Sequence, residues 1–118
     1  MNKCYYLKTC DTCKRILKEW SLPKSVLLQD IKTEEITTTQ LEEMYQLSGS
    51  YEALFSKRAK LYKERNLKNE LLTEEDYKSL ILEHYTFLKR PVLIYNHEIF
   101  IGNSKKTIAL AKQTIENE

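Results

Sequence analysis

The sequence predicts an α/β domain with a mixed sheet and an all-helical stretch in its middle, and three observations point to that class. Short apolar runs rich in aromatic and β-branched residues occur near both ends of the chain, as is typical of strands. Between them, apolar residues recur at helical spacing. The 118 residues include only two glycines and two prolines, so no flexible linker divides the chain. We therefore expect a single domain over residues 1–118.

The first third of the chain predicts a strand, a loop, a helix and a second strand. Residues 3–8 (KCYYLK) form a short Tyr-rich run that favours a strand. Residues 13–22 carry apolar side chains at helical spacing, and Asp11 or Thr12 is available to cap that helix. Residues 25–31 are apolar enough for the second strand. Two strands joined in this way in one sheet require a right-handed crossover.

The middle of the chain predicts a helical insert over about residues 34–86. A capping box begun at Thr39 opens the first helix, and Gly49 ends it. A short helix is expected around residues 51–58. Another helix begins at Thr73, whose side chain can cap it.

The last third of the chain changes from helical to strand periodicity. Residues 91–95 and 98–102 are two apolar runs joined by a two-residue turn, where Asn96 tolerates a positive φ, so they predict a β-hairpin. Residues 104–118 then form an amphipathic helix capped by Ser104. The resulting order, β-α-β, helical insert, β-β-α, is that of a thioredoxin-like domain with an all-helical insertion.

Composition and charge exclude several classes of protein. No window approaches 18 consecutive apolar residues, so no transmembrane helix is expected, and the N-terminal residues lack the apolar run of a signal peptide. The net charge of +2 is spread along the chain, and the densest basic stretch, residues 56–65, is flanked by acidic residues and lacks base-stacking aromatics. We therefore expect a cytoplasmic protein that binds neither a membrane nor nucleic acid directly.

Three cysteines, Cys4, Cys10 and Cys13, are an odd set that argues against a static disulfide framework. Cys10 and Cys13 form a CxxC pair, for which three interpretations remain. A zinc site needs four ligands, and the chain adds only Cys4 and two scattered histidines. Two buried inert cysteines are a second interpretation. We favour a redox pair, because CxxC beside a β-α-β pattern in a reducing cytosol is typical of redox-active proteins.

Cys10 is predicted in the loop that leaves the first strand, just before the helix opens. Backbone N–H groups at a helix start are unpaired and the helix dipole is positive there, so a thiolate at this place is stabilised. Lys14 and Arg15 add positive potential. Cys13 lies about one helical turn further on, within disulfide reach and better shielded, as suits an attacking thiol followed by a resolving thiol.

Arg90 and Pro91 precede the third predicted strand directly. A proline is tolerated at the start of a strand, and in thioredoxin-like folds a cis proline at this point faces the CxxC pair. The backbone of the next residue, Val92, then pairs with substrate. The planar guanidinium of Arg90 is suited to an anion beside the thiolate. An ordinary trans proline after a surface arginine is the alternative.

Three stretches, YYLKTCDTCKRILKEW, ALFSKRAKLYKE and LKRPVLIYNHEIFIGNSKK, follow one another at the spacing of one known family. Over essentially its whole length the chain resembles the arsenate reductase (ArsC) family, which also contains the transcription regulator Spx and glutathione-linked relatives. The resemblance implies a thioredoxin-like fold with a helical insert. It also implies that Cys10 corresponds to the catalytic cysteine and Arg90 to the arginine before the cis proline.

The chain departs from the arsenate reductase pattern around the oxyanion. Arsenate reductases of this type carry three arginines there, and only Arg90 matches cleanly. The position in the insert reads Ser56, with Arg58 two residues on, and the third falls near Gly102 and Asn103. Each missing guanidinium removes charge-assisted hydrogen bonds of about 1.5–3 kcal/mol. Cys13, in contrast, is shared with Spx-like members and suits disulfide cycling.

The sequence therefore predicts a cytoplasmic thiol–disulfide oxidoreductase with no bound cofactor, which takes electrons from glutathione or a thioredoxin. Cys10 attacks a disulfide or an oxyanion, Cys13 resolves the mixed intermediate, and Arg90 orients an anionic group. The expected partners are a small thiol or oxyanion substrate, or a redox partner protein. The residues expected to contact substrate are Thr12, Lys14, Arg58, Pro91, Val92, Asn103 and Ser104. The alternative is an Spx-like redox sensor that binds RNA polymerase through the region of Gly49 and the polar insert.

Overall fold

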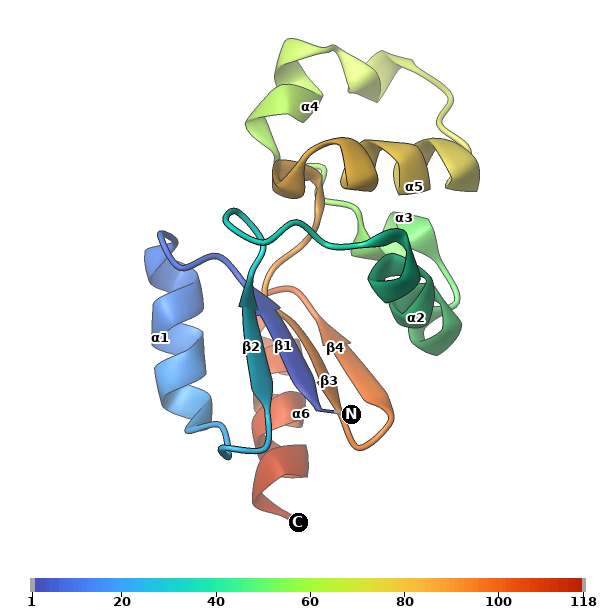
Figure 1. The fold of residues 1–118 in the computed structure, drawn as a ribbon. Coiled ribbons are helices and arrows are strands. Elements are labelled where there is room, and N and C mark those ends of the chain that lie inside the picture. The colour runs from blue at the N-terminus through green and yellow to red at the C-terminus, as the bar shows by residue number, and fades with distance from the viewer. Residues whose placement is uncertain (1, 118) are drawn as a thin grey trace. The chain divides into compact units, whose positions relative to one another are not determined.

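The computed structural model describes residues 2–117, so both end positions of the predicted 1–118 domain lie outside the described residues. The chain forms two compact units, which Figure 1 shows as a ribbon. Met1–Glu35 together with Arg90–Glu118 make the first, called here the sheet unit, and Ile36–Lys89 make the second, called the helical unit.

The sheet unit is built on a mixed four-stranded sheet. Its strands are β1 (Lys3–Tyr6), β2 (Leu27–Asp30), β3 (Val92–Tyr95) and β4 (Glu98–Ile101), in the spatial order β2-β1-β3-β4. β1 and β2 are parallel, β3 is antiparallel to β1, and β4 is antiparallel to β3. This is the predicted arrangement, because a parallel pair joined by a helix is followed by a hairpin.

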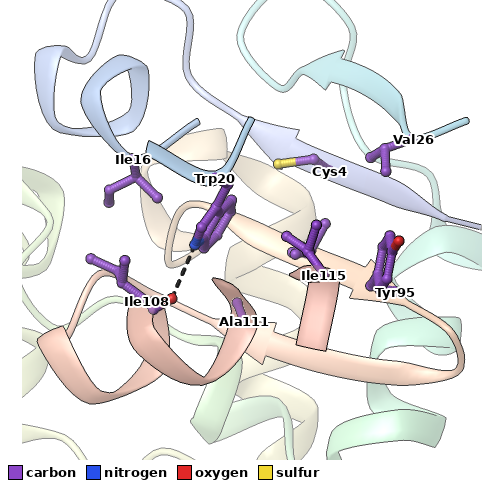
Figure 2. Close-up of a cluster of buried hydrophobic side chains, with 9 residues drawn as sticks. Cys4, Ile16, Trp20, Val26, Tyr95, Ile108, Ala111 and Ile115 are labelled. Atoms are coloured by element: carbon purple, nitrogen blue, oxygen red, sulfur yellow. Dashed lines mark hydrogen bonds between the residues drawn. The ribbon is translucent and has the colours of Figure 1, made fainter. Parts of the chain in front are cut away.

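Two helices of the sheet unit, α1 (Asp11–Trp20) and α6 (Lys105–Glu116), cover the same face of the sheet (Figure 1). Their apolar residues pack with strand residues into one core, drawn in Figure 2. The indole N–H of Trp20 donates a buried hydrogen bond of 3.1 Å to the carbonyl of Ile108, which ties α1 to α6 (Figure 2). The buried members of this core are Cys4, Ile16, Trp20, Val26, Leu93, Tyr95, Ile108, Ala111 and Ile115.

The strand directions bring four chain segments to one edge of this sheet. β1, β2 and β4 run the same way, so all three end at the edge where the antiparallel strand β3 begins. Cys10 follows β1 there and opens α1, while Arg90 and Pro91 precede β3. Ser104 follows β4 and caps α6, its side chain accepting from the Thr107 N–H at 3.1 Å. The candidate residues of the sheet unit therefore gather at one edge.

The helical unit packs around aromatic side chains. The Phe55 ring stacks on Phe87 with ring centres 5.3 Å apart and also contacts the rings of Tyr62 and Tyr77. The four aromatic residues come from four separate segments of the unit. Its helices are α2 (Thr38–Ser48), α3 (Tyr51–Leu54), α4 (Lys60–Glu64), η1 (Leu67–Asn69), α5 (Glu74–Glu83) and η2 (Tyr85–Phe87).

The predicted helix ends of the insert are correct in two places and wrong in one. Gly49, with φ of 77°, ends α2, and the Thr73 side chain caps α5 as expected. The capping box of α2, however, is formed by Thr37 with Gln40, two residues before the predicted Thr39. Both Thr37 with Gln40 and Thr39 with Glu42 fit the capping-box pattern, so the pattern alone does not decide between them, and the structure forms the first pair.

Other local predictions concern the hairpin and the connections. Asn96 and His97 both have positive φ, as a two-residue hairpin turn requires. The predicted segment around residues 51–58 is helical only over Tyr51–Leu54, and α4 follows as a separate element that the apolar spacing does not predict.

Within residues 2–117, no helix combines the length and the apolar character needed to cross a bilayer.

Candidate active site

Cys10 is the N-cap residue of α1 and the last residue of a tight turn after β1. Its N–H donates to the carbonyl of Leu7 at 3.0 Å, which closes the turn, and its carbonyl accepts the Lys14 N–H at 3.1 Å, which opens the helix. The predicted caps Asp11 and Thr12 are wrong, because both already have helical backbone within α1. The thiol of Cys10 therefore stands at the positive end of the helix dipole.

The pKa of the Cys10 thiol is lowered. Partial burial acts in the opposite direction, but the backbone N–H groups of Cys13 and Thr12, the Cys13 thiol and the charge of Arg90 together outweigh it. The Cys10 side chain makes no capping hydrogen bond of ordinary geometry in α1, so we attribute the effect of these N–H groups to their aligned dipoles. Cys10 thus has the character of a nucleophile, since the thiolate is the reactive form.

Cys13 shows the opposite behaviour one turn along the same helix. Its side chain is fully buried, and burial raises the pKa of its thiol to about 11. The negative charge and the hydrogen bond of Cys10 raise that pKa further, while the Leu7 backbone and Arg90 act to lower it. Both thiols are free. As predicted, Cys13 is the more buried member of the pair.

Cys4 lies on β1 and is fully buried in the core of the sheet unit (Figure 2). Burial raises the pKa of its thiol to about 12, with a smaller contribution from the charge of Cys13. It is therefore a neutral thiol at any ordinary pH. Within residues 2–117, no group of three or more His, Cys, Asp or Glu side chains is arranged to hold a metal ion.

Arg90 and Pro91 lie directly before β3, which begins at Val92. The peptide bond between them is cis, as expected for this position. The charge of Arg90 acts on both Cys10 and Cys13, lowering the pKa of each. Val92, the next residue, is buried and pairs with Tyr5 of β1 and with Ile101 of β4. The structure thus brings Cys10, Cys13 and Arg90 together at one edge of the sheet.

The remaining residues predicted to contact substrate have different environments. Thr12 is half-buried in the first turn of α1, and Lys14 is exposed on that helix. Asn103 and Ser104 are exposed before α6, where Ser104 is engaged as the helix cap. Arg58 is exposed in the helical unit. Their contacts with substrate stay predictions.

Asp30 also lies at this edge of the sheet, and the sequence alone does not identify it as a site residue. Asp30 ends β2, and its carboxylate accepts hydrogen bonds of 3.3 Å from the backbone N–H groups of Lys8 and Lys32. The Thr33 hydroxyl donates to its other oxygen at 3.2 Å. The only signal in the sequence is an aspartate directly after a strand, a residue that commonly binds nearby backbone N–H groups in turns. Lys8 belongs to the turn that carries Cys10.

Comparison with protein families gives one match across most of the chain. The model of the ArsC family matches residues 5–111, a range that includes all three residues of the site, Cys10, Cys13 and Arg90. A search of curated proteins by sequence finds no significant match.

Solved structures with the same fold cover nearly the whole chain. A protein from Bacteroides fragilis described as related to the ArsC family has a TM-score of 0.74 at 22% identity, covering 93% of this chain and 96% of its own. An arsenate reductase from Vibrio cholerae has a TM-score of 0.74 at 18% identity, with coverage of 93% and 96%. The protein SACOL0876 from Staphylococcus aureus has a TM-score of 0.70 at 25% identity, with coverage of 91% and 94%. These likenesses establish the thioredoxin-like fold.

Proposed function

The chain belongs to the ArsC family, and from this premise we propose that it is a thiol–disulfide oxidoreductase in which Cys10 is the nucleophile and Cys13 the resolving thiol. The observation that carries the proposal is the opposite direction of the two pKa shifts. The pKa of Cys10 is lowered at the exposed start of a helix, whereas that of Cys13 is raised in the interior. This difference supports Cys10 as the thiol that reacts first and Cys13 as the one that follows.

In the first step the Cys10 thiolate attacks one sulfur of a substrate disulfide. The S–S bond of the substrate breaks, a mixed disulfide forms between Cys10 and one half of the substrate, and the other half leaves as a thiolate. Cys10 is suited to this step because it is partly accessible and its thiolate is stabilised by backbone N–H groups and by Arg90. Cys13 cannot attack first, since it is buried and protonated.

In the second step Cys13 attacks the Cys10 sulfur. The mixed disulfide breaks, the Cys10–Cys13 disulfide forms, and the second half of the substrate leaves as a thiolate, which takes up the Cys13 proton. The reaction moves two electrons from the dithiol to the substrate. Burial is the main reason for the high pKa of Cys13, but the negative charge of Cys10 adds to it. That charge disappears when the mixed disulfide forms, so Cys13 becomes more acidic at the moment it is needed.

The oxidised pair then needs an external dithiol or two molecules of a monothiol to return it to the reduced state. We propose glutathione or a thioredoxin as the reductant and a cytoplasmic location in which either is present. Each substrate disulfide reduced consumes two electrons from that reductant. No bound cofactor takes part in this cycle.

Arg90 is the group that favours anionic substrates at this site. Its guanidinium can bind a carboxylate or an oxyanion close to the Cys10 sulfur. A single arginine binds arsenate weakly compared with three, because each charge-assisted hydrogen bond contributes about 1.5–3 kcal/mol. We therefore propose mixed disulfides with acidic groups, such as those between glutathione and a second thiol, as better substrates than arsenate.

The direct test is a single-turnover reaction of the reduced chain with oxidised glutathione, followed by mass spectrometry of the protein. We expect release of two molecules of glutathione per chain and a protein two mass units lighter, with the Cys10–Cys13 disulfide formed. The Cys10→Ser variant is the matched control and should not react. Glutathione release that is equally fast in Cys10→Ser would contradict the proposal.

Measuring disulfide turnover and binding to RNA polymerase on the same protein preparation distinguishes an oxidoreductase from an Spx-like regulator. If the chain exchanges disulfides only once and very slowly, yet binds purified RNA polymerase in its oxidised form with one-to-one stoichiometry, the regulator is the correct assignment. Rapid multiple turnover with glutathione or a thioredoxin, without polymerase binding, supports the oxidoreductase.

A further inference from the structure

The turn between β1 and α1 decides where the Cys10 thiol stands. It comprises residues 7–10 and closes with the hydrogen bond from the Cys10 N–H to the Leu7 carbonyl. A turn of this kind leaves the N–H of its second residue, Lys8, pointing outward. The chain supplies an acceptor for that N–H from a neighbouring strand.

The acceptor is the carboxylate of Asp30, 22 residues further along the chain. Asp30 pairs with Tyr6 in the parallel ladder, and the Ile31 N–H donates to the Tyr6 carbonyl at 3.0 Å, so the ends of β1 and β2 are held side by side. The Lys32 N–H donates to the same carboxylate oxygen as the Lys8 N–H, and the Thr33 hydroxyl donates to the other oxygen. The Asp30 carboxylate at the end of β2 is thus hydrogen-bonded to the turn that follows β1.

We propose that Asp30 is a positioning residue for the reaction of Cys10: its carboxylate holds the turn over residues 7–10 and thereby sets the thiol against the first N–H groups of α1. This inference rests on the proposed function, because it concerns how the same nucleophile is activated. Asp30 itself contacts neither thiol through any hydrogen bond that the structure shows within residues 2–117.

The direction in which the Cys10 pKa changes when Asp30 is replaced distinguishes a positioning role from a purely electrostatic one. A negative charge near a thiolate disfavours it, so if Asp30 acted only through its charge, removing the carboxylate would lower the pKa of Cys10. If Asp30 holds the turn, its removal loosens the alignment of the thiol with the N–H groups of Thr12 and Cys13, which are causes of the lowered pKa. The pKa of Cys10 then rises.

The asparagine variant separates the hydrogen bond from the charge. Both backbone N–H groups donate to the same carboxylate oxygen, Oδ1, which an asparagine retains. The other oxygen accepts from the Thr33 hydroxyl, which can accept from an amide as readily as it donates to a carboxylate. Asp30→Asn therefore keeps the hydrogen bond to the turn but removes the charge, whereas Asp30→Ala removes both.

The experiment measures iodoacetamide labelling of Cys10 in the full chain between pH 5 and pH 9, with the labelled site read by mass spectrometry. It compares the wild type with Asp30→Ala, Asp30→Asn and Glu35→Ala, the last removing an exposed carboxylate from the same loop. We expect Asp30→Ala to raise the apparent pKa of Cys10 by about half a unit, which slows labelling up to about threefold at pH values below that pKa. Asp30→Asn and Glu35→Ala should retain the wild-type profile.

Each outcome has a defined meaning. An unchanged or lowered Cys10 pKa in Asp30→Ala, even with reduced stability, overturns the proposal, as does Asp30→Asn behaving like Asp30→Ala. If Asp30→Ala does not fold, Asp30→Glu takes its place, since it keeps the charge but moves the oxygen away from the Lys8 N–H, and a rise in the Cys10 pKa is again required. A wild-type Cys10 with an ordinary thiol pKa would instead contradict the proposed function.

Discussion

Cys10 and Cys13 have the same side chain, and only their positions on α1 make them different. Cys10 stands at the helix start beside unpaired N–H groups and the charge of Arg90, while Cys13 is enclosed in the core. An attacking thiol must be accessible and partly ionised, and a resolving thiol must be protected until the mixed disulfide forms. The separation of roles follows from these two environments.

Replacing Cys13 by Ser should trap the intermediate of the proposed cycle. Without the resolving thiol, the mixed disulfide between Cys10 and glutathione has no intramolecular route to break, so it accumulates. Incubation with oxidised glutathione should add one glutathione per chain, detected by the mass of the intact protein. Cys4→Ala is the control. It keeps both Cys10 and Cys13, so it should not retain bound glutathione. A Cys13→Ser protein that never carries glutathione would contradict the assigned roles.

Replacing Arg90 by Ala should reduce the preference for anionic disulfides. Arg90 is half-buried and a substrate carboxylate beside it stays partly solvated, so their ion pair should contribute roughly 0.2–1 kcal/mol, less than a desolvated charge-assisted bond. The rate with oxidised glutathione should therefore fall up to about fivefold more than the rate with neutral 2-hydroxyethyl disulfide. Stopped-flow measurement of both reactions gives this ratio. Arg90→Lys should recover part of the preference, and Arg15→Ala, which removes an exposed cation from α1, should not alter it. Equal losses with both disulfides would contradict an anion-binding role.

At the scale of single elements, helix caps fix where the segments of the helical unit begin. The Thr73 hydroxyl accepts the Asp76 N–H at 3.2 Å, and the Asp76 carboxylate accepts the Thr73 N–H at 2.8 Å. Each bond satisfies a donor that a helix start would leave unpaired. The cap therefore stabilises α5 at a point outside the sheet unit that holds the thiols.

Thr73→Ala should lower the free energy of unfolding by about 1 kcal/mol, the typical cost of a lost N-cap. Urea denaturation followed by circular dichroism measures this change. Thr73→Ser keeps the hydroxyl and should remain close to the wild type. Both variants should label at Cys10 with the wild-type pH profile, so a shifted profile in Thr73→Ala would contradict the assignment of this cap to stability alone.

The elements also show what the sequence can and cannot predict. The strands, the hairpin turn at Asn96 and the cap at Ser104 follow from short-range signals, and the structure confirms them. The cap of α1 is misplaced because Asp and Thr have higher cap propensity than Cys, and the turn closed by Leu7 decides the boundary instead. α4 is missed because its five residues include none that is buried, so they carry no apolar periodicity.

The residues of the candidate site also differ in whether the sequence predicts them. The CxxC pair and the arginine before the proline are visible in the sequence, because their meaning depends on spacing and on the order of the elements. Asp30 is not visible, since its role depends on the parallel register that sets Asp30 beside Tyr6 and on a backbone N–H 22 residues away. Contacts between a side chain and a distant backbone have no pattern in the sequence.

At the scale of the whole molecule, the buried thiols should limit stability at alkaline pH. The pKa of Cys4 is raised to about 12 and that of Cys13 to about 11, so both stay neutral in the folded state while the unfolded chain ionises them above about pH 9. The contribution of these thiols to the free energy of unfolding is therefore fully present below about pH 9 and declines as the pH rises above it. The expected loss is about 1.4 kcal/mol per pH unit for each thiol.

Urea unfolding at pH 8, 9 and 10 tests this dependence. The wild type should lose stability over that range, and Cys4→Ala should lose about 1.4 kcal/mol per pH unit less above pH 9, because one ionisable group is gone. The comparison of slopes cancels the contribution of tyrosines, which both proteins share. Parallel slopes for the two proteins would show that Cys4 is not shielded in the interior.

The most direct test of the central claim is the pH dependence of Cys10 alkylation in the reduced wild-type protein. Iodoacetamide is applied at graded pH and the labelled site is read by mass spectrometry. We predict that Cys10 is labelled first, with a midpoint below the value of about 8.5 of an ordinary thiol, and that Cys13 stays unlabelled until well above it. Cys10 labelling that begins only above pH 8, and no faster than that of Cys13, would contradict the account.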